Sequence, residues 1–149
     1  MSGNINISAA ISSIAEFPEL AKSTLITQDT NDAGVYAVRL YVRGKPWVVT
    51  VDDYVATFFD NKNNATTPIF SSIGSNNQFW AIILEKAFAK IKGTYASTNT
   101  ANFLEVISTF AGCPVFQYNI ADFSTDAEVL SLIKGADDAN YIIGASTSG

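Results

Sequence analysis

The most regular stretch of this chain is residues 78–93, which read QFWAIILEKAFAKIKG. Its apolar residues recur at spacings of three and four, as they do on one face of an α-helix: Trp80, Ile83, Leu84, Ala87, Phe88 and Ile91. Ser75 and Gln78 have the spacing of a capping box, and Gly93 is a typical residue just beyond a helix end. The stretch therefore predicts a helix whose apolar face packs against a core.

Upstream of this helix the pattern changes to strict alternation. In residues 35–43 the apolar side chains fall on every second position, which indicates a half-buried strand. Gly44-Lys45 is a turn signal, and residues 46–51 indicate a second strand that ends at Asp52-Asp53. Because so short a link cannot make a parallel crossover, we predict an antiparallel hairpin.

The remaining segments add further elements. A helical stripe in residues 5–21 is divided at Pro18, and capping patterns predict two more helices that end at Gly112 and Gly135. Residues 59–68 are polar and predict a surface loop. Residues 115–120 and 141–143 have the patterns of strands. The sequence thus predicts an α+β fold.

Composition restricts the classes of function. The chain has 149 residues, of which 48% are hydrophobic, and this is enough for one domain with a core. Its net charge is −5 and no basic cluster is present, so we expect no nucleic-acid partner. No apolar stretch approaches the length of about 20 residues that spans a bilayer, and no targeting signal is evident. We therefore expect no membrane insertion and a cytoplasmic location.

Histidine is absent from the sequence, and one cysteine is present. Histidine is the usual general base for Ser and Cys nucleophiles and the commonest metal ligand, so no Ser-His or Cys-His pair can be complete within these residues. Cys113 has no internal disulfide partner. We expect it to pack as a small buried hydrophobic residue rather than to act as a nucleophile.

Two further groups of residues have both a functional and a structural interpretation. Asp52-Asp53 could bind a hard cation, but neighbouring strand residues point to opposite faces. We expect one of these carboxylates to be solvated and the other to cap or to pair with a cation. Trp47 and Trp80 could stack on a ligand, but each falls on the apolar side of its element, so we expect both in the core.

Several blocks of the sequence resemble the protease core of the calpain family, which are cysteine endopeptidases with a papain-like fold. Residues 47–53, WVVTVDD, resemble that family's W-V-x-V-x-V-D-D strand, shortened by one position. Residues 78–90 resemble its E-F-W-x-x-L-L-E-K-A-Y-A-K helix, and residues 93–95 resemble its G-S-Y. Weaker matches in the same order are AAISS at 9–13, Gly112 in the place of a T-G-G glycine, and IGAS at 143–146. The resemblance implies that residues 1–112 form a mainly helical first subdomain with a β-hairpin, and that residues 113–149 form the incomplete start of a β-rich second subdomain.

The departures from that family concern its site residues. By this resemblance Ile5 occupies the position of the family's nucleophilic cysteine, while its oxyanion-hole glutamine, its His and its Asn would fall outside these residues. Gln78 stands where the family has a calcium-binding Glu, and Ser97-Thr98-Asn99 stand in place of a substrate-lining S-G-G. The resemblance therefore predicts no catalytic residue, no metal site and no cofactor, and we expect that the chain is not an enzyme.

Three functions are then compatible with the sequence. The first is a catalytically inactive calpain-like domain, a pseudoenzyme that binds a protein partner or a second copy of itself. The contact would use the apolar residues of the two predicted C-terminal strands: Val115, Phe116, Ile142 and Ile143. The second is part of a calpain-like calcium-dependent cysteine endopeptidase whose catalytic residues lie outside this chain. The third is a small-molecule-binding module unrelated to proteolysis.

Overall fold

The computed structural model describes residues 5–62, 64–68 and 78–146. The chain divides into two compact units, Met1–Cys113 and Pro114–Gly149. Helices and antiparallel strands occur together in the first unit, which confirms the predicted α+β class. That these units correspond to the two halves of a protease core remains a prediction.

The centre of the first unit is an antiparallel hairpin of β1 (Val35–Val42) and β2 (Lys45–Asp52). Its register pairs Val42 with Lys45 and Leu40 with Trp47. The two residues of the turn, Arg43 and Gly44, both have positive φ, at 52° and 74°. A two-residue turn of this kind matches the right-handed twist of the strands, which explains the tight link. The predicted hairpin is confirmed.

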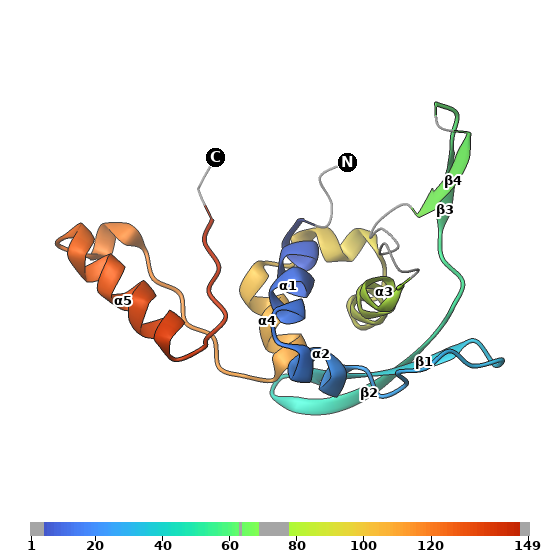
Figure 1. Ribbon diagram of the computed structural model, residues 1–149, viewed down its shortest axis with the longest axis horizontal. Helices are drawn as coiled ribbons and strands as arrows, with labels where there is room; N and C mark the ends of the chain where they lie inside the picture. Colours follow the sequence, from blue (N-terminus) through green and yellow to red (C-terminus); the bar gives the residue numbers. More distant parts are fainter. Residues whose placement is uncertain (1–4, 63, 69–77, 147–149) are drawn as a thin grey trace. The chain divides into compact units, whose positions relative to one another are not determined.

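Helices cover one face of this hairpin. Both α3 (Trp80–Lys92) and α4 (Phe103–Ala111) pack on the strands, and α1 (Ile5–Ala15) packs on α4 and α3 (Figure 1). Every second residue of β1 is buried beneath them, namely Tyr36, Val38 and Leu40. In the core the rings of Phe88 and Phe110 lie 5.9 Å apart. The middle of the predicted stripe is therefore buried as expected, whereas Trp80 and Ile91 at its two ends are half-buried.

The helix ends follow their predicted signals. Pro18 begins α2 (Pro18–Thr24), so the N-terminal stripe is indeed two helices. Asn102 caps α4 because its side chain accepts a hydrogen bond of 2.8 Å from the Glu105 amide. Gly112 ends α4 in the left-handed conformation, at φ 65°. The predicted capping box of Ser75 and Gln78 does not begin α3, because the helix starts at Trp80 with Phe79 as its N-cap and no side-chain cap; Ser75 itself lies outside the described residues.

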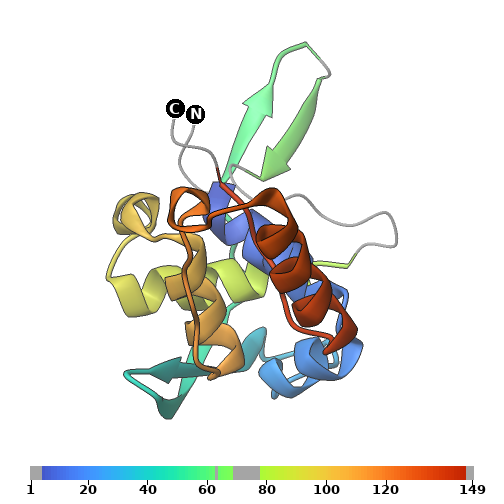
Figure 2. The same ribbon diagram turned by 90° about the vertical axis from the view of Figure 1, so that its left-hand side faces the viewer.

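The prediction of a surface loop in the first unit is wrong. Residues 59–68 are not all loop, because β3 (Thr57–Asp60) pairs with β4 (Ala65–Pro68) in a second hairpin. Phe58 and Phe59 face Thr67 and Thr66 there, and aromatic and threonine side chains favour strands despite the polar turn between them. The two hairpins lie apart from each other in both views (Figures 1 and 2).

Trp47 is also not in the core, since 59% of it is exposed. It has the same parity as the buried Val49 and Val51, but it lies in the half of β2 near the turn, where this strand has no buried residue. Trp80 begins α3 and is half-buried.

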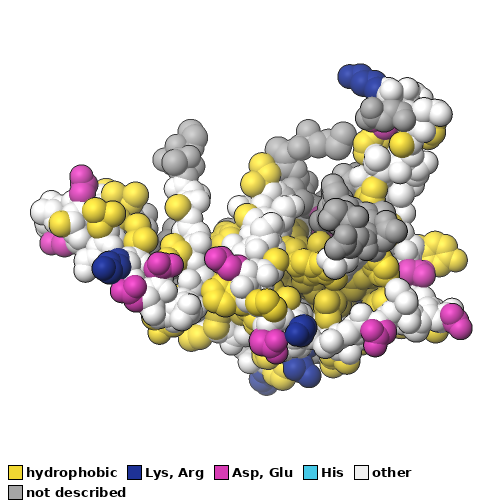
Figure 3. Space-filling model, in the orientation of Figure 1, with side chains coloured by type: hydrophobic (Ala, Val, Ile, Leu, Met, Phe, Trp, Pro, Cys, Tyr) yellow, Lys and Arg dark blue, Asp and Glu magenta, His cyan; other side chains and the backbone are white. Residues whose placement is uncertain are grey.

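In the described part of the second unit, residues 114–146, the regular elements are η2 (Ile120–Asp122) and α5 (Asp126–Asp138). Thr125 caps α5 as predicted, by accepting from the Glu128 amide. The helix continues through Gly135 rather than ending there, because this glycine does not adopt a positive φ. Hydrophobic side chains are visible over α5 in Figure 3, and Leu130 and Ile133 are exposed.

The strands predicted at 115–120 and 141–143 do not form in these described residues. A strand needs a hydrogen-bonded neighbour, and no paired segment is found in this unit within residues 114–146. The β-rich start of a second subdomain, expected for 113–149, is therefore not seen there as strands.

No described helix of either unit has the length and hydrophobicity to cross a membrane.

Candidate functional site

The position that the family resemblance assigns to the nucleophile lies at the start of a helix. Ile5 is the first residue of α1 and is 70% exposed. Its neighbour Asn6 donates a side-chain hydrogen bond of 2.9 Å to the carbonyl oxygen of Ala101. This bond joins the beginning of α1 to the segment between η1 (Ala96–Thr100) and α4. The candidate site is therefore built from residues that are distant in the sequence.

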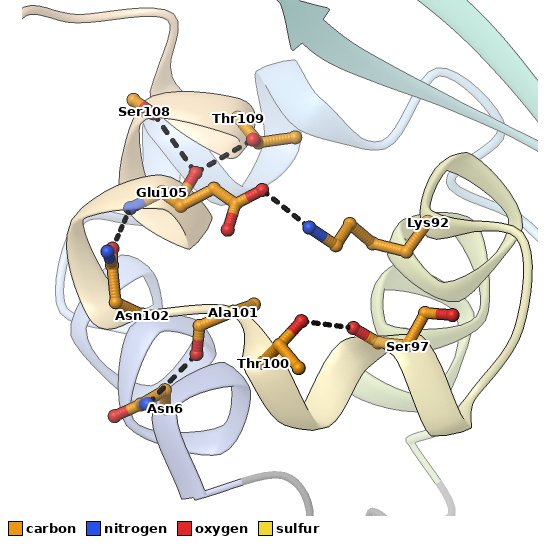
Figure 4. A network of polar contacts seen from close by, with 9 residues as sticks. All are labelled: Asn6, Lys92, Ser97, Thr100, Ala101, Asn102, Glu105, Ser108 and Thr109. Atoms are coloured by element: carbon orange, nitrogen blue, oxygen red, sulfur yellow. Dashed lines mark hydrogen bonds and ion pairs between the residues drawn. The ribbon is translucent and has the colours of Figure 1, made fainter.

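A network of polar contacts holds this region together (Figure 4). The Lys92 ammonium at the end of α3 pairs with the Glu105 carboxylate of α4 at 2.8 Å. The Glu105 amide is held by Asn102, and its carbonyl oxygen accepts from the hydroxyl groups of Ser108 and Thr109. The ends of α1, α3 and α4 are thus tied to one another, which positions the helix that begins at Ile5.

Ser97-Thr98-Asn99 lie in η1. We expected their side chains to fill the space that glycines would leave open for a substrate. Thr98 does not do so, because it is buried and its hydroxyl donates to the Tyr95 carbonyl oxygen at 2.6 Å. Ser97 is half-buried with its hydroxyl 2.8 Å from that of Thr94, and Asn99 is exposed. Of the three, Ser97 and Asn99 are the side chains with access to solvent.

The two carboxylates after β2 behave as the structural interpretation predicted. Asp52 forms an ion pair with Lys86 of α3, and its carboxylate also accepts from the Tyr54 amide at 3.0 Å. Hydrogen bonding from Lys86, followed by that from Tyr54, lowers the pKa of Asp52 below its usual value of 3.8. Asp53 is exposed. Within the described residues no group of His, Cys, Asp and Glu could hold a metal ion.

The ion pair of Asp52 predicts a dependence of stability on pH. A carboxylate whose pKa is lowered by folding stabilises the native state above its unfolded pKa, and this contribution is lost as pH falls through the folded pKa. We expect the stability difference between the wild type and Asp52→Asn to be largest at neutral pH and to shrink below about pH 4. Urea unfolding at pH 7 and pH 3 measures it. The exposed Asp29→Asn change is the control, and an equal pH effect in both variants would contradict the prediction.

Described residues of the first unit line a pocket beside β2 and another near the end of α4. One, of about 470 Å³, is lined by β2 and α3 residues that include Asp52, Lys86 and Tyr95. Burial, and then the negative charges of Glu85 and Asp52, raise the pKa of Tyr95. The other, of about 360 Å³, is lined by residues that include Arg43, Lys92, Glu105 and Cys113.

Cys113 is exposed, so the expectation of a buried cysteine is wrong. The reason is local: it follows Gly112, where the chain leaves α4, and it is the last residue of the first unit. The sequence contains no histidine that could activate its thiol.

The other predicted site residues are dispersed. Gln78 is exposed and precedes α3. The four residues predicted to make a protein contact all lie in the second unit, where Val115, Phe116 and Ile143 are exposed and Ile142 is half-buried.

Sequence reasoning missed Asn6, Lys86 and Lys92, whose partners are far along the chain. The position of Lys86 and Lys90 off the apolar stripe of α3 was the available signal.

Comparison with known proteins gives a consistent result. The model of the calpain family cysteine proteases matches residues 1–149. The chain is 34% identical over 87 residues to "Calpain-type cysteine protease DEK1" of Zea mays and to "Calpain-type cysteine protease ADL1" of Oryza sativa subsp. japonica. These matches cover 57% of this chain and 4% of each relative. It is 28% identical over 119 residues to "Calpain-A" of Drosophila melanogaster, which covers 79% of this chain and 13% of that protein.

These matches correct one prediction. From Ile5 and the absence of histidine we expected that the chain is not an enzyme, but its relatives are cysteine proteases, which are enzymes. The chain spans only 4% to 13% of the length of these relatives. The absence of histidine from its 149 residues therefore does not show that the protein is not an enzyme. Since the family model matches the whole sequence, this chain belongs to the calpain family of cysteine proteases.

Proposed function

We propose that this chain is part of a calpain-type cysteine endopeptidase, in which its helical unit is a scaffold of the protease core. The observation that carries the proposal is the family match over residues 1–149 in a chain that spans 4% to 13% of the relatives' length. A cysteine protease needs a thiolate and a base in contact. Since the sequence has no histidine, the proposal places the base, and the nucleophile with it, in residues outside these 149.

The structure supports the scaffold role in one respect. The start of α1, where the family resemblance places the nucleophile, is fixed to the η1–α4 segment by Asn6 and Ala101 at 2.9 Å. The Lys92–Glu105 pair fixes the end of α3 to the same segment. The catalytic groups, which this proposal places in other residues, must be held to within a fraction of an ångström, and a helical unit tied together by such contacts gives them a rigid surface to pack on.

The test begins with the native polypeptide that contains these residues, captured with an antibody to the first unit. Its intact mass is measured, and hydrolysis of a fluorogenic peptide is followed with and without calcium and with a thiol-directed epoxide. We expect a mass well above 16.0 kDa and calcium-dependent hydrolysis that the epoxide blocks. The Cys113→Ser variant is the control and should keep this activity, because the proposal places the nucleophile outside these residues and Cys113 has no histidine of this chain beside it. Hydrolysis that the epoxide leaves unchanged would contradict the proposal.

A second proposal concerns the second unit, which we propose makes a protein–protein contact. It is supported by the exposed apolar side chains of the described residues 114–146, among which Phe116 is 74% exposed. Apolar side chains that gather on one surface are typical of an interface, and Figure 3 shows such side chains over α5. We expect Phe116→Asp to weaken association, measured by light scattering, while the melting of the helical unit is unchanged. Tyr54→Asp, on an equally exposed aromatic of the first unit, should leave association unaltered, and equal effects of both changes would exclude this contact.

A further inference from the structure

The register of the β1–β2 hairpin determines which main-chain groups of β2 face outward. In a hairpin with a two-residue turn, the residues that flank the turn form a hydrogen-bonded pair, and such pairs recur at every second residue. Val42 and Lys45 flank the turn, so Trp47, Val49 and Val51 also bond to β1. The main-chain groups of Pro46, Val48, Thr50 and Asp52 then point away from β1, along the outer edge of β2.

The corresponding edge of β1 is occupied by another segment of the chain. The Ala37 carbonyl oxygen accepts from the amides of Ile26 and Thr27, at 2.9 and 3.2 Å. The Ala37 amide in turn donates to the Thr27 hydroxyl at 3.1 Å. A strand edge with unpaired groups is a template for another strand, and this contact closes the middle of the β1 edge.

Among the described residues, the groups that bond to the outer edge of β2 are side chains. The Lys90 ammonium donates to the Thr50 carbonyl oxygen at 2.6 Å, and the Lys86 ammonium donates to the Asp52 carbonyl oxygen at 3.1 Å. Lys86 also donates to the Tyr54 carbonyl oxygen at 2.5 Å. Pro46, the outward-facing residue nearest the turn, has no amide to donate.

The spacing of the two lysines matches that of the carbonyl groups. Residues four apart on an α-helix are separated by about 6 Å along its axis. Outward-facing carbonyls of a strand recur every two residues, which is about 6.8 Å. The residue numbers rise along α3 from Lys86 to Lys90 while those of their partners fall along β2 from Asp52 to Thr50, so the helix and the strand run in opposite directions. Two lysines on one face of α3 therefore reach two successive outward-facing carbonyl oxygens of β2.

We propose that Lys86 and Lys90 form a lysine clamp that closes the outer edge of β2 to strand addition. Each ammonium occupies a carbonyl oxygen that the amide of an incoming strand would otherwise use. Lys90 also places a positive charge at the edge, while the charge of Lys86 is paired with Asp52, and a charged side chain on an edge strand is a common way for proteins to prevent edge-to-edge pairing. In the described residues neither lysine bonds to the outward-facing amide and carbonyl groups of Val48, next to the exposed Trp47. An incoming strand could pair with these groups, so the edge needs the protection that the clamp gives.

The test removes both ammonium groups and keeps the aliphatic side chains, with Lys86→Met/Lys90→Met in the full chain. We expect this variant to associate through β2, so that its mass by light scattering rises with concentration to that of a dimer or larger species. The matched control is Lys22→Met/Lys134→Met, which removes the same charge and likewise one ion pair, Lys22–Glu19. It should behave like the wild type, as should Lys86→Arg/Lys90→Arg, which retains the donors.

A third substitution separates edge pairing from general aggregation. Val48→Pro removes an outward-facing amide without removing a bond of the hairpin, so adding it to the methionine variant should restore the monomer. Association that Val48→Pro leaves unchanged, or a folded methionine variant that stays monomeric, would overturn the proposal.

A measurement on the wild-type chain covers the case in which the methionine variant does not fold. Hydrogen-bonded ammonium groups exchange slowly with water, so nitrogen NMR should detect those of Lys86 and Lys90 and not that of the exposed Lys134. Equally fast exchange at all three lysines would overturn the proposal.

Discussion

Phe88→Ala is expected to lower the free energy of unfolding of the helical unit by about 3–5 kcal/mol. Phe88 is only 1% exposed and lies on the face of α3 that packs towards Phe110 of α4. Removing the ring loses its transfer from water and leaves a cavity between two helices and the hairpin. Small domains are stable by about 5–15 kcal/mol in total, so this single change removes a large share of that stability.

Urea unfolding followed by far-ultraviolet circular dichroism measures this effect. Phe59→Ala is the matched control, because it removes the same ring from β3, where the residue is 57% exposed. We expect that change to cost less than about 1 kcal/mol. Similar losses for the two variants would mean that α3 does not form the centre of the core.

The first-unit elements that were predicted well are those with a strong local signal. Pro18 fixes the boundary between α1 and α2, and Asn102 and Gly112 mark the ends of α4, because each acts through the geometry of its own neighbours. The β1–β2 hairpin follows from alternation and a short turn. These features need no knowledge of distant segments.

The predictions that failed depend on tertiary contacts. Trp47 has the parity of the core face, yet it is exposed, because parity gives the face of a strand and not how far the covering helices extend. Residues 115–120 alternate like a strand, but a strand forms only with a partner, and none is paired with them in the described residues. Gly135 remains in α5 because a glycine permits a helix end without requiring one.

The candidate site was predictable in part for the same reason. The family resemblance assigns the nucleophile position to Ile5, which is the first described residue of α1. The contacts that hold this position, from Asn6 to Ala101 and from Lys92 to Glu105, join residues separated by 95 and 13 positions. Polar side chains on a helix surface are usually solvated, so the position of Lys86 and Lys90 off the apolar stripe of α3 does not by itself show that they bond to β2.

The second large effect is expected at Gly112, where alanine should destabilise the unit by about 2–5 kcal/mol. The residue has φ 65°, and a left-handed conformation costs a residue with a side chain about 1–2 kcal/mol. A Cβ atom there would also lie 2.7 Å from three ring carbons of Tyr41 on β1. The ring or the end of α4 would have to move, and overpacking of this kind adds about 1–3 kcal/mol.

Gly44→Ala separates the two contributions. Gly44 has a similar φ of 74°, but no atom lies within 4 Å of the position of its Cβ, so this change carries the backbone cost alone. In a Tyr41→Ala background, Gly112→Ala should then cost no more than Gly44→Ala does, because the ring that opposes the methyl group is gone. Urea unfolding of the four combinations at positions 41 and 112 provides this comparison. If the cost of Gly112→Ala is the same with and without the Tyr41 ring, then α4 does not end against β1 in the way that the structure shows.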